Sequence, residues 1–223
     1  MRGAPTGPRP DADAAYAALP RPYLRAHHHP AGHDIVALFA ERAADYRAVV
    51  ERVAPVGLPA AITRALTSRA DAFERIRGGF SADAAEKPPR IGIVVPDGVP
   101  EEWVEGLPGS IVLVRDEPPL SAAQLDEVAG VVTGCAVAIA ETGTIVLDHG
   151  PAQGRRGLTL VPDFHLVIVR ADQVAADLPD AFGRLDPGRP QTLISGPSAT
   201  SDIELIRVEG VHGPRNLHIL LAS

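Results

Sequence analysis

Uninterrupted runs of aliphatic residues constrain the fold of this chain more than any other feature of its sequence. The clearest runs cover residues 90–95, 111–114, 165–170 and 217–221. Strands that read as continuous aliphatic runs, without alternating polar residues, are typical of a parallel sheet that is buried on both faces. Because only 4% of the 223 residues are aromatic, the core of such a sheet must be built from Ala, Val, Leu and Ile.

Segments with helical spacing alternate with these strands. Ile35, Leu38 and Phe39 recur at helical spacing directly after Asp34, a residue type that suits the N-cap position. The alternation predicts a layered α/β domain with a mostly parallel sheet at residues 33–223, preceded by a tail at 1–32 that is rich in Pro, Ala and Arg. Further helices are expected at 59–69, with an extension to 77, and at 172–183. Another helix is expected to begin at the capping-box pattern of 121–124 and to run into 130–133. Further strands are expected at 47–53, 136–140, 144–147 and 191–194.

Composition and charge exclude several classes of protein. The net charge of −7 argues against non-specific binding of nucleic acid, which needs a positive field. Cys135 is the only cysteine, so the chain can hold no internal disulfide, iron–sulfur cluster or cysteine-rich zinc site. Lys87 is the only lysine, which disfavours Schiff-base chemistry. The N-terminus has no apolar segment of signal-peptide length, and no apolar run can span a bilayer, so we expect a cytoplasmic protein.

Residues 195–214 (SGPSATSDIELIRVEGVHGP) are richer in Gly, Pro and small polar residues than a plain connector between two strands requires. One interpretation is structural: Ser201 and Glu204 fit a capping box, so the segment contains a well-capped helix and nothing more. The other interpretation is an anion site. Backbone N–H groups that follow the carboxyl end of a strand, together with the hydroxyls of Ser198 and Thr200, attract negative charge.

Two further segments are candidates for the same site. Residues 141–144 (ETGT) form either a hairpin turn with Glu141 in water or a group of polar side chains that face the crevice of Ser198. Residues 154–157 (GRRG) form either an exposed basic turn or a bidentate grip on a phosphate or carboxylate. The sequence contains no dinucleotide-binding motif, no P-loop motif and no His/Glu spacing typical of a zinc enzyme. Residues 27–29 (HHH) are interpreted as surface histidines, and no metal site is predicted.

Two long segments taken together resemble the LUD domain family, specifically its lactate utilization protein C (LutC/YkgG) group. They are AIAETGTIVLDHGPAQGRRGLTLVPDFHLVIV at 138–169 and SGPSATSDIELIRVEGVHGP at 195–214, and the resemblance extends over about residues 34–221. It implies a fold similar to the NagB/RpiA/CoA-transferase-like superfamily, a parallel α/β sheet with helices on both faces. It also implies membership of a three-protein system that oxidises L-lactate to pyruvate, in which the partner proteins carry the cysteine-rich and iron–sulfur motifs.

The motif positions of the family suggest which residues form a site. Our hypothesis is an accessory subunit whose crevice binds a small anion or docks a redox partner, with Glu141 and His212 as the acid/base pair. The family's motif positions fall on Glu141, Thr142, Gly143, Thr144, Arg155, Gly196, Pro197, Ser198, Asp202, Glu204, His212, Gly213 and Pro214. The predicted ligand-binding residues are Thr142, Gly143, Thr144, Arg155, Gly196, Ser198, Thr200, Asp202, Gly213 and Arg215.

Two other hypotheses remain open. In one, the chain is a stand-alone enzyme that transfers an acyl or phosphate-bearing group, with Glu141 as nucleophile or base; this rests on analogy at the level of the fold. In the other, the chain is a scaffold whose motifs shape the fold and bind nothing. In all three hypotheses the chain itself carries no cofactor, and the resemblance places iron–sulfur clusters in the partner proteins.

Overall fold

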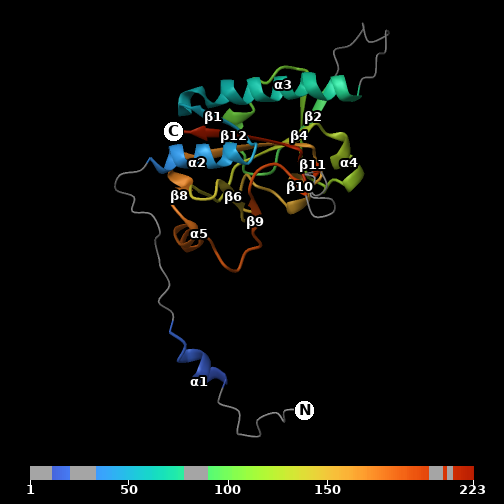
Figure 1. The fold of residues 1–223 in the computed structure, drawn as a ribbon. Coiled ribbons are helices and arrows are strands. Elements are labelled where there is room, and N and C mark those ends of the chain that lie inside the picture. The colour runs from blue at the N-terminus through green and yellow to red at the C-terminus, as the bar shows by residue number, and fades with distance from the viewer. Residues whose placement is uncertain (1–11, 21–33, 78–89, 201–207, 210–212) are drawn as a thin grey trace.

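Six parallel strands form the main sheet of the computed structural model (Figure 1). The structure describes residues 12–20, 34–77, 90–200, 208–209 and 213–223. Every neighbouring pair of strands in this sheet is parallel, so the predicted parallel α/β sheet is confirmed. In spatial order the strands are β1 (Val49–Val53), β12 (Asn216–Ala222), β7 (Phe164–Arg170), β4 (Gly130–Thr133), β2 (Ile91–Val94) and β3 (Ile111–Val114).

The longest pairing joins β7 and β12 in the interior of the sheet. Seven residue pairs are in register, from Phe164 opposite Asn216 to Arg170 opposite Ala222. Within β7, Leu166 and Ile168 pack into the core on one face of the sheet, whereas their neighbours in sequence, 167 and 169, pack into the core on the other. Both faces of the strand are therefore buried, which is why its sequence is aliphatic without alternation.

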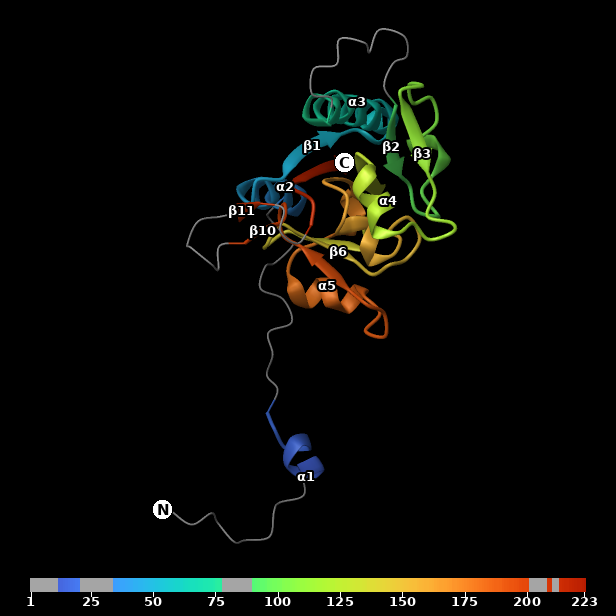
Figure 2. The same ribbon diagram turned by 90° about the vertical axis from the view of Figure 1, so that its right-hand side faces the viewer.

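Helices cover both faces of the main sheet, as Figures 1 and 2 show, and this prediction too is confirmed. Helix α3 (Leu58–Arg77) lies along one face and buries Ile62 and Leu66 against it. On the other face, α2 (Ile35–Asp45) packs over β7 and β12, and α4 (Ala122–Glu127) packs over β2 and β4.

Local sequence signals determine where α2 and α4 begin. The Asp34 carboxylate accepts hydrogen bonds from the backbone N–H groups of Val36 and Ala37, at 3.1 and 3.0 Å. Ser121 and Gln124 form a reciprocal capping box ahead of α4. Such caps satisfy N–H groups that have no partner within the helix and stabilise it by about 1 kcal/mol each. Both predicted helix starts are confirmed.

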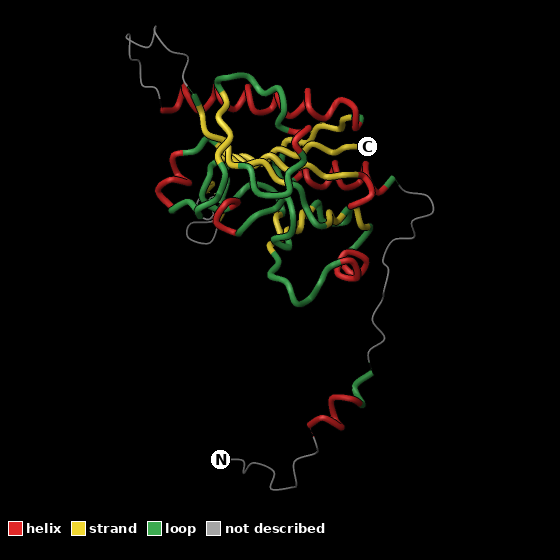
Figure 3. The backbone as a smooth tube through the Cα atoms, turned by 180° about the vertical axis from the view of Figure 1, so that it is seen from behind, coloured by secondary structure: helices red, strands yellow, loops and turns green. Residues whose placement is uncertain are grey.

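A second sheet of four strands packs against the α2 side of the main sheet, and Figure 3 shows the two sheets as separate layers. Its strands β5 (Val137–Ile139) and β6 (Thr144–Leu147) form the predicted hairpin and pair antiparallel. β8 (Val174–Ala175) pairs with β5, and β9 (Thr192–Ile194) pairs with β6. Helix α5 (Leu178–Arg184) covers the outer face of this sheet.

The remaining elements are short. Helix α1 (Ala12–Ala17) lies in the predicted tail, where residues 13–20 are exposed; the rest of residues 1–32, including the histidines at 27–29, lies outside the described residues. Residues 199–200 and 208–209 form a short two-stranded sheet. The predicted capping box of Ser201 and Glu204, which falls between these two strands in the sequence, also lies outside the described residues. These elements are η1 (Pro55–Gly57), η3 (Glu101–Trp103), η4 (Arg156–Thr159), η5 (Ala171–Gln173), β10 (Ala199–Thr200) and β11 (Val208–Glu209).

Two helices predicted from the sequence are too long. The helix that follows Ser121 ends at Glu127, and the run 130–133 is the interior strand β4, so its four residues are buried in the sheet. The helix expected at 172–183 is wrong over its first six residues, which form η5, β8 and a turn. The reason is Asp177, whose carboxylate accepts a hydrogen bond from the Asp180 N–H at 3.0 Å and so starts α5 at Leu178.

Gly143 allows the β5–β6 hairpin to pack directly on α2, and its replacement should destabilise the fold. Its φ is +62°, and a Cβ at this position would overlap the backbone of Arg42 and Ala43. Because positive φ and the overlap both oppose a side chain, we expect Gly143→Ala to lower the free energy of unfolding by roughly 2–5 kcal/mol in urea titrations. Gly183→Ala is the matched control, because nothing lies within 4 Å of the added Cβ. Equal stability of the two variants would contradict this account.

Candidate functional site

A cavity of about 300 Å³ lies between the carboxyl end of β9 and the amino ends of β7 and β12. We call it the β9 pocket. It follows a strand end, as predicted, but that strand belongs to the smaller sheet, and relative to the main parallel sheet the pocket lies at the amino edge. The pocket is lined by Arg156, Thr159, Leu160, His165, Thr192, Leu193, Ile194, Ser195, Gly196, Pro197, Ser198, Gly213, Pro214 and Leu217.

Backbone geometry brings the two ends of the predicted segment together in this pocket. The Ser198 N–H donates a hydrogen bond to the Pro214 carbonyl at 2.8 Å. Gly213 has a φ of +153°, and a Cβ there would lie 3.3 Å from the Ser198 Cβ. Gly196 has a φ of +82°, and a Cβ there would lie 2.5 Å from the Tyr46 carbonyl oxygen. The glycines therefore permit the close approach that shapes the pocket wall.

A chain of hydroxyl groups links the predicted 141–144 segment to the pocket. The Thr142 and Thr144 hydroxyls lie 2.7 Å apart, and the Thr144 hydroxyl lies 2.8 Å from that of Ser195. Thr144 is buried, whereas Ser195 lines the pocket. The two threonines therefore orient Ser195 rather than line the pocket themselves, and Gly143 has the packing role described above.

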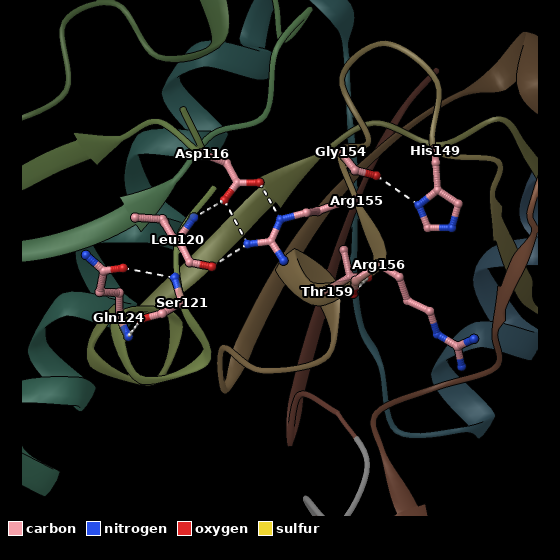
Figure 4. A network of polar contacts seen from close by, with 9 residues as sticks. All are labelled: Asp116, Leu120, Ser121, Gln124, His149, Gly154, Arg155, Arg156 and Thr159. Atoms are coloured by element: carbon pink, nitrogen blue, oxygen red, sulfur yellow. Dashed lines mark hydrogen bonds and ion pairs between the residues drawn. The ribbon is translucent and has the colours of Figure 1, made fainter. Parts of the chain in front are cut away.

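Of two consecutive arginines, the second rather than the first lines the β9 pocket. Figure 4 shows the Arg155 guanidinium against Asp116, with hydrogen bonds of 2.6 and 2.9 Å to the carboxylate and one of 2.6 Å to the Leu120 carbonyl. Arg156 points away from this cluster, and within the described part of the chain its guanidinium makes no hydrogen bond or ion pair. The positive charge available to a ligand in the pocket is that of Arg156.

Arg155 lines a different cavity, of about 440 Å³, at the carboxyl ends of β2 and β3. Its pairing with Asp116 lowers the pKa of that carboxyl and compensates the arginine's charge, so this larger cavity offers less to an anion. Arg215 is also placed elsewhere, because it forms an ion pair with Asp163 and lines a third cavity beneath α3. The structure thus brings neither Arg155 nor Arg215 to Ser198.

His165 contributes a buried imidazole to the pocket. Its Nε2 lies 2.8 Å from the Thr133 hydroxyl, and the residue is 1% exposed. Burial lowers the pKa of His165 to about 3, because the charged form would lose its hydration. The imidazole is therefore neutral near pH 7 and offers hydrogen bonding but no charge.

The predicted acid/base pair is only partly described. Glu141 is partly buried, its backbone N–H donates to the Ala176 carbonyl at 3.1 Å, and it is not among the residues that line the β9 pocket. His212 and Asp202 lie outside the described residues, as does the side chain of Thr200. The pairing of Glu141 with His212 stays a prediction.

Three pocket residues were not among the predicted ligand-binding residues. Ser195 and Arg156 belong to the candidate segments 195–214 and 154–157, but only the path of the backbone decides which neighbour faces the cavity, and His165 lies in neither segment.

The cysteine and the acidic residues give no sign of a metal centre in the described residues, which contain no group of three or more His, Cys, Asp or Glu side chains suited to a metal ion. Cys135 is a buried free thiol whose pKa is raised to about 12 by burial, so it is protonated and unreactive near neutral pH. Among the described helices, none combines the length and the hydropathy needed to cross a membrane.

Comparisons with known proteins agree on one family. Residues 121–222 match the LUD domain. Lactate utilization protein C of Deinococcus radiodurans is 42% identical over 221 residues, which are 97% of this chain and 89% of that protein. The uncharacterized protein YkgG of Escherichia coli is 36% identical over 84 residues, 34% of this chain and 36% of the relative. A crystal structure of a DUF162 family protein from Deinococcus radiodurans is similar at a TM-score of 0.64 with 37% identity, covering 91% of this chain and 100% of the other.

The neutral, buried His165 should make the folded state sensitive to acid. Its pKa of about 3 lies below the usual 6.5, so the unfolded chain binds the proton more readily and stability falls as the pH drops from 6.5 towards 3. We expect His165 to account for a loss of about 2 kcal/mol in the free energy of unfolding between pH 7 and pH 5.

Urea titrations at the two pH values test this directly. His165→Gln should show a correspondingly smaller loss between pH 7 and pH 5. Thr133→Val is the control, because it removes the hydrogen bond of His165 but keeps the titrating group, so it should lower stability at both pH values and retain the pH dependence. An unchanged pH dependence in His165→Gln would refute the assignment.

Proposed function

The chain belongs to the LUD domain family, and we propose that it is an accessory subunit of a system that oxidises L-lactate to pyruvate. The observation that carries this proposal is the similarity, over nearly the whole chain, to a protein named lactate utilization protein C. The match spans both the core and the residues of the β9 pocket, rather than a single short motif.

The electron carriers of the proposed system lie in other proteins. One buried cysteine with a raised pKa cannot hold an iron–sulfur cluster, which needs several thiolates. The partners that we propose are the iron–sulfur and cysteine-rich proteins of the system, and the proposed location is the cytoplasm. The role left to this chain is to bind a small molecule or a partner rather than to carry electrons.

We assign the binding role to the β9 pocket, with a small carboxylate anion as its ligand. The Arg156 guanidinium supplies a positive charge and paired N–H donors, the arrangement that carboxylates accept best. The hydroxyls of Ser195 and Ser198 add hydrogen bonds, and the apolar side of the pocket, formed by Leu160 and Leu217, suits a short carbon chain. A volume of about 300 Å³ accommodates a three-carbon acid together with water molecules.

The alternative enzyme, in which Glu141 attacks an acyl group, receives no support from the pocket. Glu141 does not line the cavity that holds Arg156 and Ser198. A nucleophile must lie within about 3–3.5 Å of the atom that it attacks. The scaffold hypothesis differs from the accessory role in requiring no bound ligand, so a charge-removing variant in the pocket separates the two.

Lactate oxidation by the reconstituted system should depend on Arg156. The experiment combines this chain with its iron–sulfur partners and measures L-lactate-dependent reduction of an electron acceptor. Because a charge-assisted hydrogen bond contributes about 1.5–3 kcal/mol, we expect Arg156→Gln to lower the rate at sub-saturating lactate at least tenfold.

Arg64→Gln is the matched control. Arg64 is an exposed residue on α3, on the far side of the main sheet, and pairs with Glu51. It should support oxidation at the wild-type rate. Full activity of Arg156→Gln would exclude the proposed binding role of the pocket and favour the scaffold hypothesis. Full activity of the partners without this chain would overturn the accessory role itself.

A further inference from the structure

A second pocket lies beneath α3, on the face of the main sheet opposite the β9 pocket. We propose that this pocket, which we call the α3 pocket, is a separate binding site for the oxyanion of a small organic acid or ester. Its volume is about 240 Å³. It is lined by Arg47, Val49, Ala65, Ser68, Arg69, Ala72, Phe164, Arg215, Asn216, Leu217 and His218.

Positive charge is concentrated in the lining of the α3 pocket. Arg69 and Arg215 share a single carboxylate, that of Asp163, whose two oxygens they contact separately. Arg47 adds a third guanidinium to the lining. In a chain with a net charge of −7, two guanidiniums that share one carboxylate leave a local excess of positive charge that an anion can compensate.

Arg69, one of the arginines that line this pocket, is buried in the core. The Arg69 side chain is 7% exposed, and its Nε donates to the Ala129 carbonyl at 3.2 Å. Its guanidinium lies 5.6 Å from the ring centres of both Phe73 and Phe164. A buried guanidinium is costly unless its position is fixed and its donors are satisfied, so a rigidly held Arg69 is suited to organise a ligand.

His218 provides a second and independent sign of a ligand. Its Nε2 is a buried side-chain nitrogen without a hydrogen-bond partner in the described part of the chain. The ring packs edge-on against Phe164, with 6.5 Å between centroids and an angle of 84°. Burial lowers the pKa of His218, which favours the neutral ring. Because an unsatisfied buried nitrogen is unfavourable, a ligand oxygen that accepts from it would remove the penalty.

The remaining walls define the body of the ligand. Val49, Leu217, the two alanines of α3 and the Phe164 ring make part of the pocket apolar. An oxyanion attached to a compact apolar or aryl group fits this combination of charge and surface. A carboxylate and a phosphate monoester share this chemistry, and the experiment below separates them.

The two pockets can be tested separately because β12 begins between them. Of these two pockets, Arg215 and His218 line the α3 pocket and not the β9 pocket, whereas Arg156 lines the β9 pocket and not the α3 pocket. Leu217, near the amino end of β12, lines both. Variants at Arg215 and His218 therefore report on the α3 pocket, and variants at Arg156 report on the β9 pocket.

The test is a titration of the full chain with benzoate, phenyl phosphate and inorganic phosphate. Binding is monitored through the NMR signals of the His218 ring and of the backbone amides of residues 215–218. We expect saturable binding of benzoate or of phenyl phosphate; whichever binds more tightly identifies a carboxylate or a phosphate ester as the ligand class. Arg215→Gln and His218→Leu should each weaken that binding at least tenfold, whereas Arg156→Gln, in the β9 pocket, should leave it within twofold.

Failure of all three anions to saturate below about 10 mM would remove the site, since weaker binding is of little use at cellular concentrations. Binding that is unaffected by both Arg215→Gln and His218→Leu would place the anion elsewhere. Arg215 is 54% exposed, so its variant is expected to fold, and thermal unfolding of both variants checks this. None of these results depends on lactate oxidation, so this proposal can fail independently of the proposed function.

Discussion

Seven parallel residue pairs between β7 and β12 hold the interior of the main sheet together and position both candidate pockets. Both faces of these strands are buried along most of their length. The polar side chains that line the two cavities therefore lie at the amino ends of the strands. His165 lies at the start of β7 on the β9-pocket side, and His218 lies at the start of β12 on the α3 side. The same pairing thus fixes one imidazole on each face of the sheet.

The amino edge of a parallel sheet is not where ligands usually bind in such folds, since crevices form more often at the carboxyl ends. In this chain the second sheet changes the situation. The end of β9 and the glycines at 196 and 213 bring hydroxyl-bearing backbone to the amino edge. At the carboxyl edge, Arg155 and Asp116 compensate each other's charge. Arg156, which has no ion-pair partner among the described residues, lies at the amino edge instead.

The fold followed from the sequence wherever the signal was local and long. Continuous aliphatic runs predicted the strands of the main sheet, and the side chains of Asp34 and Ser121 predicted two helix starts. The prediction failed at 130–133 because four apolar residues directly behind a helix read equally well as its last turn. It failed at 172–177 because a two-residue strand has no periodicity to detect.

The candidate site was less predictable for a physical reason. Glycines 196 and 213 and Ser198 were found because they belong to one contiguous segment. The roles of Arg155 and Arg156 were not separable, since adjacent residues differ only in which way the short helix η4 turns them. The distant carboxylates of Asp116 and Asp163 then decide which arginines are already paired.

In our proposal, Arg156 and the serines beside it bind a small carboxylate. The most direct measurement is an NMR titration of the purified chain with L-lactate and with pyruvate, following the amide signals of Ser195, Gly196 and Ser198. We expect saturable shifts at these three positions that disappear in Arg156→Gln. Shifts that are absent from the β9 pocket, or that persist in Arg156→Gln, would contradict the proposal.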